Sequence, residues 1–195
     1  HIVLPEVGGV GQVALADAHV VLVGCGGIGS PVLQYLAAAG IGRLTLIDSD
    51  TVEISNLQRQ TIFTPSDIGK PKAESATEWV RRFDLGLKVD AINERVGVDN
   101  VAQILSGASV VLDGCDNFAT RLIVSDSCVK LAIPLTSAAI GKFQGQVGNF
   151  AGHLALQKQP LGRIVVHGDG DPVCLLRATD FTGTPPRRTE LVRAG

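Results

Sequence analysis

The chain has 195 residues, of which 45% are hydrophobic and 18% are charged. This balance is typical of a globular domain with a sizeable core. The net charge of -2 leaves no basic excess for a nucleic-acid or membrane surface. No apolar run approaches the roughly 20 residues that cross a bilayer, so the sequence predicts neither a nucleic-acid partner nor a membrane location.

Two further features of the composition are the scattered cysteines and the absence of Met. The chain contains no Met and begins at His1, which indicates an excerpt of a longer protein or a processed chain. No CxxC pair occurs among the four cysteines, so neither zinc nor a redox dithiol is indicated. Such cysteines fit buried thiols in a reducing cytoplasm. They are Cys25, Cys115, Cys128 and Cys174.

Strand and helix patterns alternate along the first two thirds of the chain. An uninterrupted apolar, β-branched run predicts a buried strand at residues 18–24. Further strands are predicted at residues 43–48, 87–96 and 108–114. Apolar residues at helical spacing predict helices at residues 31–39, 71–83, 100–105 and 118–132. In the first helix, Ser30 is the expected N-cap, Pro31 the first helical residue and Gly40 the stop.

After Pro134 the pattern changes to two strand-like runs, at residues 135–141 and 143–150. They predict an antiparallel pair that extends an otherwise parallel sheet. The predicted fold is α/β, with a doubly wound, Rossmann-like, mostly parallel sheet and an added antiparallel strand pair near its C-terminal end. Residues 1–150 form this domain, and residues 151–195 are a poorly specified tail.

A glycine-rich turn follows the first strand, with glycines at Gly24, Gly26, Gly27 and Gly29. The backbone of such a turn can approach phosphate groups, and the free amides of the next helix favour negative charge there. Asp48 ends the second strand about twenty residues later, the usual position of an acid that binds ribose hydroxyls. The alternatives are helix–strand packing for the glycines and turn capping for Asp48.

The segment that begins at Asp48, DSDTVEISNLQRQ, concentrates polar groups. Arg59 supplies a guanidinium for phosphate charge. Five other side chains offer oxygens or amides to a ligand: Asp50, Ser55, Asn56, Gln58 and Gln60. For Asp50, turn capping and support of the site stay equally open. The pattern predicts a site that binds a triphosphate.

Three further candidates lie later in the chain. Lys72 follows Pro71 at a predicted helix start, where the helix dipole disfavours a cation, so an anionic partner is indicated. Asp116 and Asn117 follow the fourth strand, where carboxylate and amide oxygens can bind a hard cation. Asp116 is the candidate that holds Mg²⁺ against the phosphates. The alternative is that Asp116 or Asn117 caps the following helix.

In order and spacing, five motifs resemble the adenylating domain of the ubiquitin-activating-enzyme superfamily: GCGGIGSP, DSDTVEISNLQRQ, GKPKAES, DGCDNFATR and AAIGKFQGQVGNF. The similarity is greatest to the bacterial ThiF/MoeB/HesA branch and covers roughly residues 1–150. It implies that ATP and Mg²⁺ serve to adenylate the C-terminal glycine carboxylate of a small ubiquitin-like sulfur-carrier protein, releasing pyrophosphate. Such carriers belong to molybdopterin or thiamine synthesis.

The resemblance also implies a role for each matched residue: Gly27, Asn56, Arg59 and Lys72 contact the ATP phosphates, Asp48 contacts the ribose, and Asp116 organises Mg²⁺. The implied catalytic residues are Arg59, Lys72 and Asp116. A homodimer is implied for the full-length protein, because family members carry an arginine, in a stretch just before the position of His1, that reaches the partner subunit's ATP.

Three features depart from the family pattern. That arginine-bearing stretch is missing before His1. Members usually carry two CxxC pairs that hold zinc, whereas only Cys174 lies in the corresponding region, so we expect no zinc in this chain. The resemblance ends near Gly152. Packing is the expected role of the other three cysteines. Cys174 is the one candidate for a reactive thiol, but its apolar neighbours would not lower its pKa. We therefore expect no stable thioester or persulfide through a dedicated catalytic cysteine.

Other functions stay open at this point. An NAD-dependent oxidoreductase of Rossmann type would explain the glycine turn and Asp48 equally well, but not Asn56, Arg59 or Lys72. A non-catalytic fragment of the adenylating family would keep the fold without turnover. Family members that activate a tRNA-bound carboxylate share the motifs, although the near-neutral charge of this chain argues against a nucleic-acid substrate.

Overall fold

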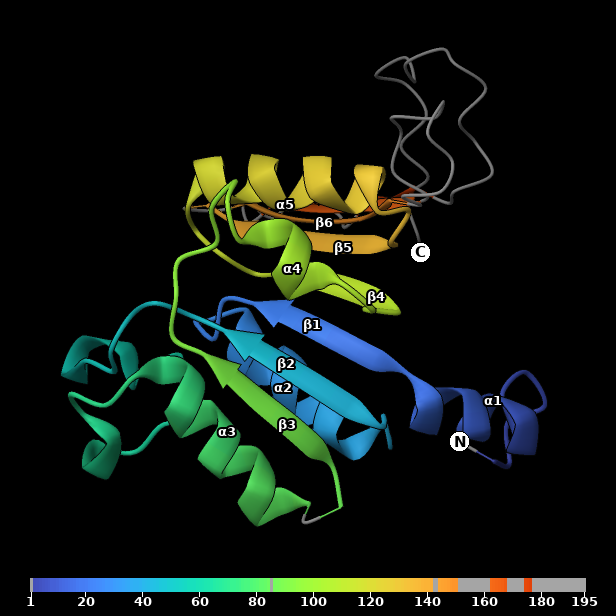
Figure 1. The fold of residues 1–195 in the computed structure, drawn as a ribbon, viewed down its shortest axis with the longest axis horizontal. Coiled ribbons are helices and arrows are strands. Elements are labelled where there is room, and N and C mark those ends of the chain that lie inside the picture. The colour runs from blue at the N-terminus through green and yellow to red at the C-terminus, as the bar shows by residue number, and fades with distance from the viewer. Residues whose placement is uncertain (1, 85, 142–143, 151–161, 168–173, 177–195) are drawn as a thin grey trace.

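The computed structural model describes residues 2–84, 86–141, 144–150, 162–167 and 174–176. These residues form one eight-stranded sheet with flanking helices (Figure 1). The strands are β1 (His19–Val23), β2 (Arg43–Ile47), β3 (Lys88–Ile92), β4 (Val110–Asp113), β5 (Leu135–Ile140), β6 (Gln144–Phe150), β7 (Gly162–His167) and β8 (Cys174–Leu176). The helices are α1 (Gly8–Asp17), α2 (Gly29–Ala38), α3 (Lys72–Phe83), α4 (Val101–Leu105) and α5 (Phe118–Lys130), with 3-10 turns η1 (Ile54–Asn56) and η2 (Pro65–Asp67).

The strand order is β3-β2-β1-β4-β5-β6-β7-β8. Neighbouring strands from β3 to β5 are parallel, and β5 with β6, β6 with β7, and β7 with β8 are antiparallel. The predicted mostly parallel sheet and its antiparallel β5–β6 pair are therefore confirmed. The sheet continues into β7 and β8, beyond the predicted boundary at residue 150. The division of the chain at that boundary stays a prediction.

The chain reverses its direction across the sheet between β1 and β4. From β1 it moves outward through β2 to β3, and then returns to place β4 on the other side of β1. The connections after β1 and after β4 therefore leave the sheet in opposite directions, which opens a crevice at the carboxyl ends of these two strands. Ligands of doubly wound sheets bind at such a point.

Both faces of the central strands are buried, because successive side chains of a strand point to opposite faces. On one face, Val20 and Leu22 of β1 pack with α2 and α3. On the other face, Val21 and Val23 pack with α4 and α5. Figure 1 shows α2 and α3 beside β1, β2 and β3, and α5 beside β5 and β6. This two-sided burial explains why the central strands are mostly apolar.

The predicted N-cap of α2 is wrong. Helix α2 begins at Gly29, and the Ser30 N–H already donates to the Gly26 carbonyl over 2.9 Å. Ser30 therefore lies inside the first helical turn, and its hydroxyl is buried without a hydrogen-bond partner among the described residues. The prediction failed because the glycine turn coils directly into the helix. Gly40 does end the helix, with a φ of 77° that favours glycine.

The remaining predicted helices and strands are present with slightly shorter bounds. Helix α1 was not predicted, because its apolar residues form no buried stripe. In the described part of the chain, no helix has both the length and the apolar character needed to cross a membrane.

Candidate functional site

A cavity of about 850 Å³ lies in the crevice at the carboxyl ends of β1, β2 and β4. Its walls come from the glycine turn, the segment after β2, the start of α3 and the loop after β4. Most of the predicted site residues line it: Gly24, Gly26, Gly27, Asp48, Asp50, Asn56, Arg59, Lys72, Asp116 and Asn117. Topology thus gathers residues that lie as far apart in the sequence as Gly24 and Asn117.

The glycines of the turn have different physical roles. Gly24 has a φ of 92°, and a side chain there would meet the backbone of Cys115 at 3.0 Å, so the turn touches the loop after β4. Gly29 does not line the cavity. A Cβ atom at Gly29 would lie 2.0 Å from the Gly24 carbonyl oxygen. Gly29 therefore lets the start of α2 pack against the end of β1, the packing alternative of the sequence analysis.

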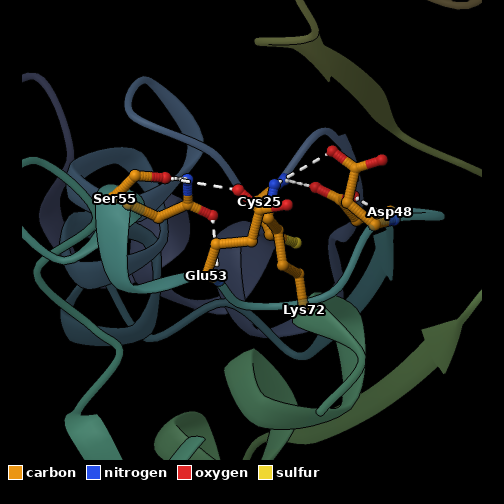
Figure 2. A network of polar contacts seen from close by, with 7 residues as sticks. Cys25, Asp48, Glu53, Ser55 and Lys72 are labelled. Atoms are coloured by element: carbon orange, nitrogen blue, oxygen red, sulfur yellow. Dashed lines mark hydrogen bonds and ion pairs between the residues drawn. The ribbon is translucent and has the colours of Figure 1, made fainter. Parts of the chain in front are cut away.

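Asp48 is held in place by two backbone groups. Its Oδ2 accepts from the Cys25 N–H over 2.8 Å, and its Oδ1 accepts from the Asp50 N–H over 2.9 Å (Figure 2). Burial, the largest influence, raises the pKa of Asp48, while these two hydrogen bonds oppose the rise. A carboxylate has lone pairs for further donors. Asp48 can thus accept hydrogen bonds from ligand hydroxyl groups from a fixed position.

Lys72 reaches the cavity because two segments pair outside the main sheet. Thr51 and Pro71 form an isolated antiparallel bridge, and the Lys72 N–H donates to the Asp50 carbonyl over 2.9 Å. The Lys72 side chain is 8% exposed, and its Nζ donates to Asp50 Oδ2 over 3.0 Å (Figure 2). The anionic partner predicted for a cation at this helix start is therefore present within the chain. Asp50 itself stays 67% exposed and accessible to a ligand.

The turn after β2 is held together by its own side chains. Asn56 Oδ1 accepts from the Glu53 N–H over 3.2 Å, and Asn56 Nδ2 donates to Ser55 Oγ over 3.3 Å. The Ser55 hydroxyl donates to Glu53 Oε2, also over 3.2 Å (Figure 2). Asn56 lines the cavity, whereas Ser55 does not. Ser55 therefore stabilises the turn from outside the cavity.

Arg59 lies across the glycine turn. Its Cδ atom would be 3.3 Å from a Cβ atom at Gly27, and its Nη1 donates to the Ser55 carbonyl over 3.2 Å. Gln58 is exposed and outside the cavity lining. The reason is helical spacing, because positions 56, 59 and 60 share one face of the turn and position 58 lies on another. The sequence predicts where the polar cluster lies in the chain, but not which face of the turn each of its side chains occupies.

The loop after β4 presents Asp116 to the cavity. Asn117 Oδ1 accepts from the Thr120 N–H over 3.0 Å, so Asn117 caps α5, one of the two predicted alternatives. Asp113 is turned inward, where it accepts from the Ser137 hydroxyl over 2.7 Å and lies 3.5 Å from the Arg121 guanidinium. Asp116 is exposed and makes no hydrogen bond or ion pair within the described residues. Its carboxylate is thus free for a cation.

Several lining residues lie outside the predicted set of site residues. Glu94 and Arg95 follow β3 at the same sheet edge. The predicted strand over residues 87–96 was too long and included them, although their polarity marks the end of the strand. Thr120 lies in the first turn of α5. Gln60, a member of the predicted polar cluster, is buried in the cavity wall.

The three cysteines with described side chains are free thiols. Burial, followed by the negative charge of Asp48, raises the pKa of the Cys25 thiol. Burial is also the largest reason that the pKa of Cys115 and the pKa of Cys128 rise to about 12. These shifts favour the neutral thiol, which agrees with the predicted packing role. The side chain of Cys174 lies outside the described residues.

In the native protein at pH 8, we expect Cys25, Cys115 and Cys128 to react with iodoacetamide at least about 100-fold more slowly than an exposed cysteine. The thiolate is the nucleophile, and a thiol pKa near 12 leaves very little of it at this pH. Time-resolved peptide mass spectrometry measures each rate. Protein unfolded in guanidinium serves as the control, in which all three label rapidly. Fast labelling of native Cys115 would contradict this expectation.

Comparison with known proteins places these features in a family. The model of the ThiF family matches residues 1–177. The chain is 47% identical over 146 residues to the SAMP-activating enzyme E1 of Haloferax volcanii, covering 75% of this chain and 54% of that protein. It is 45% identical over 148 residues to the sulfur carrier protein adenylyltransferase of Thermus thermophilus, covering 76% of this chain and 55% of that protein.

Among solved structures, the chain is similar to the E. coli tRNA N6-threonylcarbamoyladenosine dehydratase TcdA in complex with AMP. The TM-score is 0.65 at 37% identity, covering 67% of this chain and 53% of that chain. The chain spans about half the length of the curated relatives that it matches. We expected the resemblance to the family to end near Gly152, but the family model matches as far as residue 177. The polar motifs end before Gly152, whereas the strand β7 lies beyond it and within the match. The chain belongs to the ThiF family.

Proposed function

We propose that this protein uses ATP to adenylate the C-terminal glycine carboxylate of a small ubiquitin-like sulfur-carrier protein, with release of pyrophosphate. One observation carries the proposal: Arg59 and Lys72 converge on a glycine turn beside the fixed carboxylate of Asp48. Relatives named as a sulfur carrier protein adenylyltransferase and a SAMP-activating enzyme support the reaction. The bound AMP of the TcdA structure supports an adenine nucleotide as ligand.

Each residue has a distinct task in this reaction. Asp48 accepts hydrogen bonds from the ribose hydroxyls, and the backbone at Gly27 lies against the phosphates. The carrier carboxylate attacks the α-phosphorus, and the bond to the bridging oxygen of the leaving pyrophosphate breaks. Negative charge grows on that pyrophosphate, where Arg59 and Lys72 neutralise it. Asn56 assists at the phosphates with its amide.

A magnesium requirement fits the charge of the cavity wall. Five acidic and three basic side chains line the cavity, so a triphosphate entering it needs additional positive charge. No group of three or more His, Cys, Asp or Glu residues in the described part of the chain could hold a metal ion by itself. The free carboxylate of Asp116 would share Mg²⁺ with phosphate oxygens, as is usual for this ion. Bound there, Mg²⁺ would supply charge neutralisation at the phosphates.

We expect Mg-ATP to raise the thermal midpoint of the protein by several degrees at ten times its dissociation constant or above, whereas NAD at the same concentration leaves the midpoint unchanged. Ligands that bind only the folded state stabilise it. A nicotinamide cofactor has no need of the two cations at the glycine turn. Omission of Mg²⁺ is the control and should reduce the shift. A shift with NAD and none with Mg-ATP would favour the oxidoreductase alternative.

Adenylation itself is tested by ATP–pyrophosphate exchange in the full-length protein, with and without added carrier proteins. Exchange that depends on a carrier of molybdopterin or thiamine synthesis supports the proposal and names the pathway. Exchange that depends instead on a tRNA-bound carboxylate would indicate that the substrate is a tRNA, as the similarity to TcdA suggests, and not a carrier protein. Binding of Mg-ATP without exchange under either condition would identify a non-catalytic member.

The oligomeric state and cellular location belong to the same proposal. The family resemblance implies that the full-length protein is a homodimer in which each subunit completes the other's ATP site. Sedimentation of the full-length protein as a monomer at tens of micromolar would contradict this. A cytoplasmic location rests on the scattered free thiols, of which Cys25 and Cys128 are buried.

A further inference from the structure

The carboxyl edge of the parallel strands carries highly exposed hydrophobic side chains. Among the described residues, seven large hydrophobic side chains are at least 73% exposed, and four of these lie at this edge. They lie after β2, β3 and β4 and at the end of β5, one for each strand. We call these four residues the apolar rim: Ile54, Val98, Phe118 and Ile140. Because the carboxyl ends of parallel strands meet at one edge of a sheet, the rim gathers around the crevice.

The apolar rim borders the cavity of the candidate site. Ile140 lines this cavity, and each of the other three rim residues lies one or two positions after a residue that lines it. These lining residues are Glu53, Val96 and Asn117. A protein substrate whose end enters the cavity would therefore rest on the loops that carry the rim.

Such exposure is not a general property of the connections in this protein. At the opposite, amino edge of the sheet, the aliphatic residues shortly before β2, β3 and β5 are 6%, 7% and 7% exposed. They are Ile41, Leu87 and Ile133. Turn geometry does not require Ile or Val, because turns favour Gly, Pro, Asn, Asp and Ser. Large side chains held this far out of the core around one crevice indicate a surface that another molecule covers.

The size of the apolar rim fits a protein partner. Its four side chains present on the order of 400 Å² of apolar surface. A standard protein–protein interface covers about 800 Å² on each partner, of which somewhat more than half is apolar. The rim therefore supplies most of the apolar area that one interface of this size needs.

We propose that the apolar rim is the docking surface for the folded body of the small carrier protein whose C-terminal tail enters the cavity. The inference rests on the proposed function and adds the surface that recognises the carrier. The partner has an exposed apolar patch beside an extended C-terminal tail, so that the patch lies on the rim while the tail reaches the cavity. Phe118 is the expected anchor, because aromatic side chains bury the largest apolar area in interfaces.

The test compares Phe118→Ser with Tyr35→Ser in the full-length protein. Both changes remove an aromatic side chain, 73% and 79% exposed, but Tyr35 lies on α2, outside the rim and the cavity lining. ATP–pyrophosphate exchange is measured against the concentration of purified carrier proteins of molybdopterin and thiamine synthesis. Phe118→Ser should raise the KM for the carrier that supports exchange about tenfold. Because Phe118 does not line the cavity, kcat and the affinity for Mg-ATP should stay unchanged, and Tyr35→Ser should keep all wild-type values.

A synthetic peptide with the sequence of the carrier's C-terminal tail separates the role of the tail from that of the folded body. The peptide has the reacting carboxylate but no apolar patch. The wild type should therefore need far more peptide than whole carrier, and Phe118→Ser should use the peptide as the wild type does.

A second pair of variants covers the case in which Phe118→Ser does not fold. Val98→Ser removes a rim residue on the other side of the glycine turn, and Val10→Ser removes a valine of α1 outside the rim. The two valines are 74% and 86% exposed, so neither change should disturb the core. Val98→Ser should raise the KM for the carrier at least about threefold, whereas Val10→Ser should leave it unchanged.

Three results would overturn the inference. An unchanged KM for the carrier in folded Phe118→Ser and Val98→Ser would show that the rim does not contact the carrier. A tail peptide that serves as well as the whole carrier would show that the body adds no binding. Sedimentation of Phe118→Ser as a monomer, where the wild type is a dimer, would assign the rim to a contact between copies of this chain. A wild type without carrier-dependent exchange would instead reject the proposed function, and this inference with it.

Discussion

Replacement of Arg59 by alanine is expected to lower ATP–pyrophosphate exchange of the full-length protein about 10³-fold, or about 4 kcal/mol of transition-state stabilisation, while the fold survives. The Arg59 side chain crosses Gly27, and one of its N–H groups is used by the Ser55 carbonyl. Its other donors are free to bind phosphate oxygens as charge develops on the leaving pyrophosphate. Because Arg59 is exposed, its removal deletes little packing.

Arg82→Ala is the matched control for Arg59→Ala. Arg82 is an exposed arginine in the last turn of α3 and does not line the cavity. It should keep wild-type exchange and a wild-type thermal midpoint. Arg59→Lys should fall between the two, because it keeps the charge but loses the planar arrangement of donors. Exchange within about tenfold of wild type in Arg59→Ala would mean that Arg59 does not hold the phosphates.

The second large effect is expected for Gly29→Ala, which should lower the free energy of unfolding by about 3 kcal/mol or more. Helix propensity alone predicts the opposite sign, because alanine is favoured over glycine inside a helix by about 0.5–1 kcal/mol. Packing decides here, since the new Cβ atom would lie 2.0 Å from the Gly24 carbonyl oxygen. The contact involves backbone on both sides, so neither atom can move without shifting α2 from β1.

Chemical denaturation of Gly29→Ala beside Gly97→Ala measures this effect. Gly97 has no atom within 4 Å of the position of a new Cβ atom, so its substitution should change the unfolding free energy by no more than about 0.5 kcal/mol. Equal midpoints for the two variants would contradict the packing role of Gly29. Loss of Mg-ATP binding with an unchanged denaturation midpoint would instead indicate that Gly29 contacts the ligand, as the sequence predicted.

Much of the fold could be predicted because burial on both sheet faces leaves a clear pattern. The strands β1, β2 and β4 are mostly apolar, and the residues after them change abruptly to glycine, acid and amide. That change occurs at the carboxyl edge of the sheet, where the crevice forms. Asp48, Arg59, Lys72 and Asp116 could therefore be predicted as candidates from sequence position and chemistry, and the structure places all four at one cavity.

The sequence could not decide which way each polar side chain faces. Within the turn after β2, the exposed Gln58 and the buried Gln60 are the same residue type two positions apart, and only the helical geometry of the turn separates them. Ser30 was expected as a helix cap, but the glycine turn coils straight into α2 and leaves the hydroxyl unpaired. The orientation of such side chains depends on the backbone geometry, which cannot be predicted from a short stretch of sequence.

The sequence by itself determined the alternation of strands and helices, the family and the chemical character of the cavity, because these follow from burial and from residue type. Tertiary structure alone decided how distant groups meet. The bridge between Thr51 and Pro71 brings Lys72 to Asp50 across 22 positions, and the reversal between β1 and β4 brings the Gly24 turn against Cys115. Both contacts join segments far apart in the chain, so they arise only when the sheet has assembled.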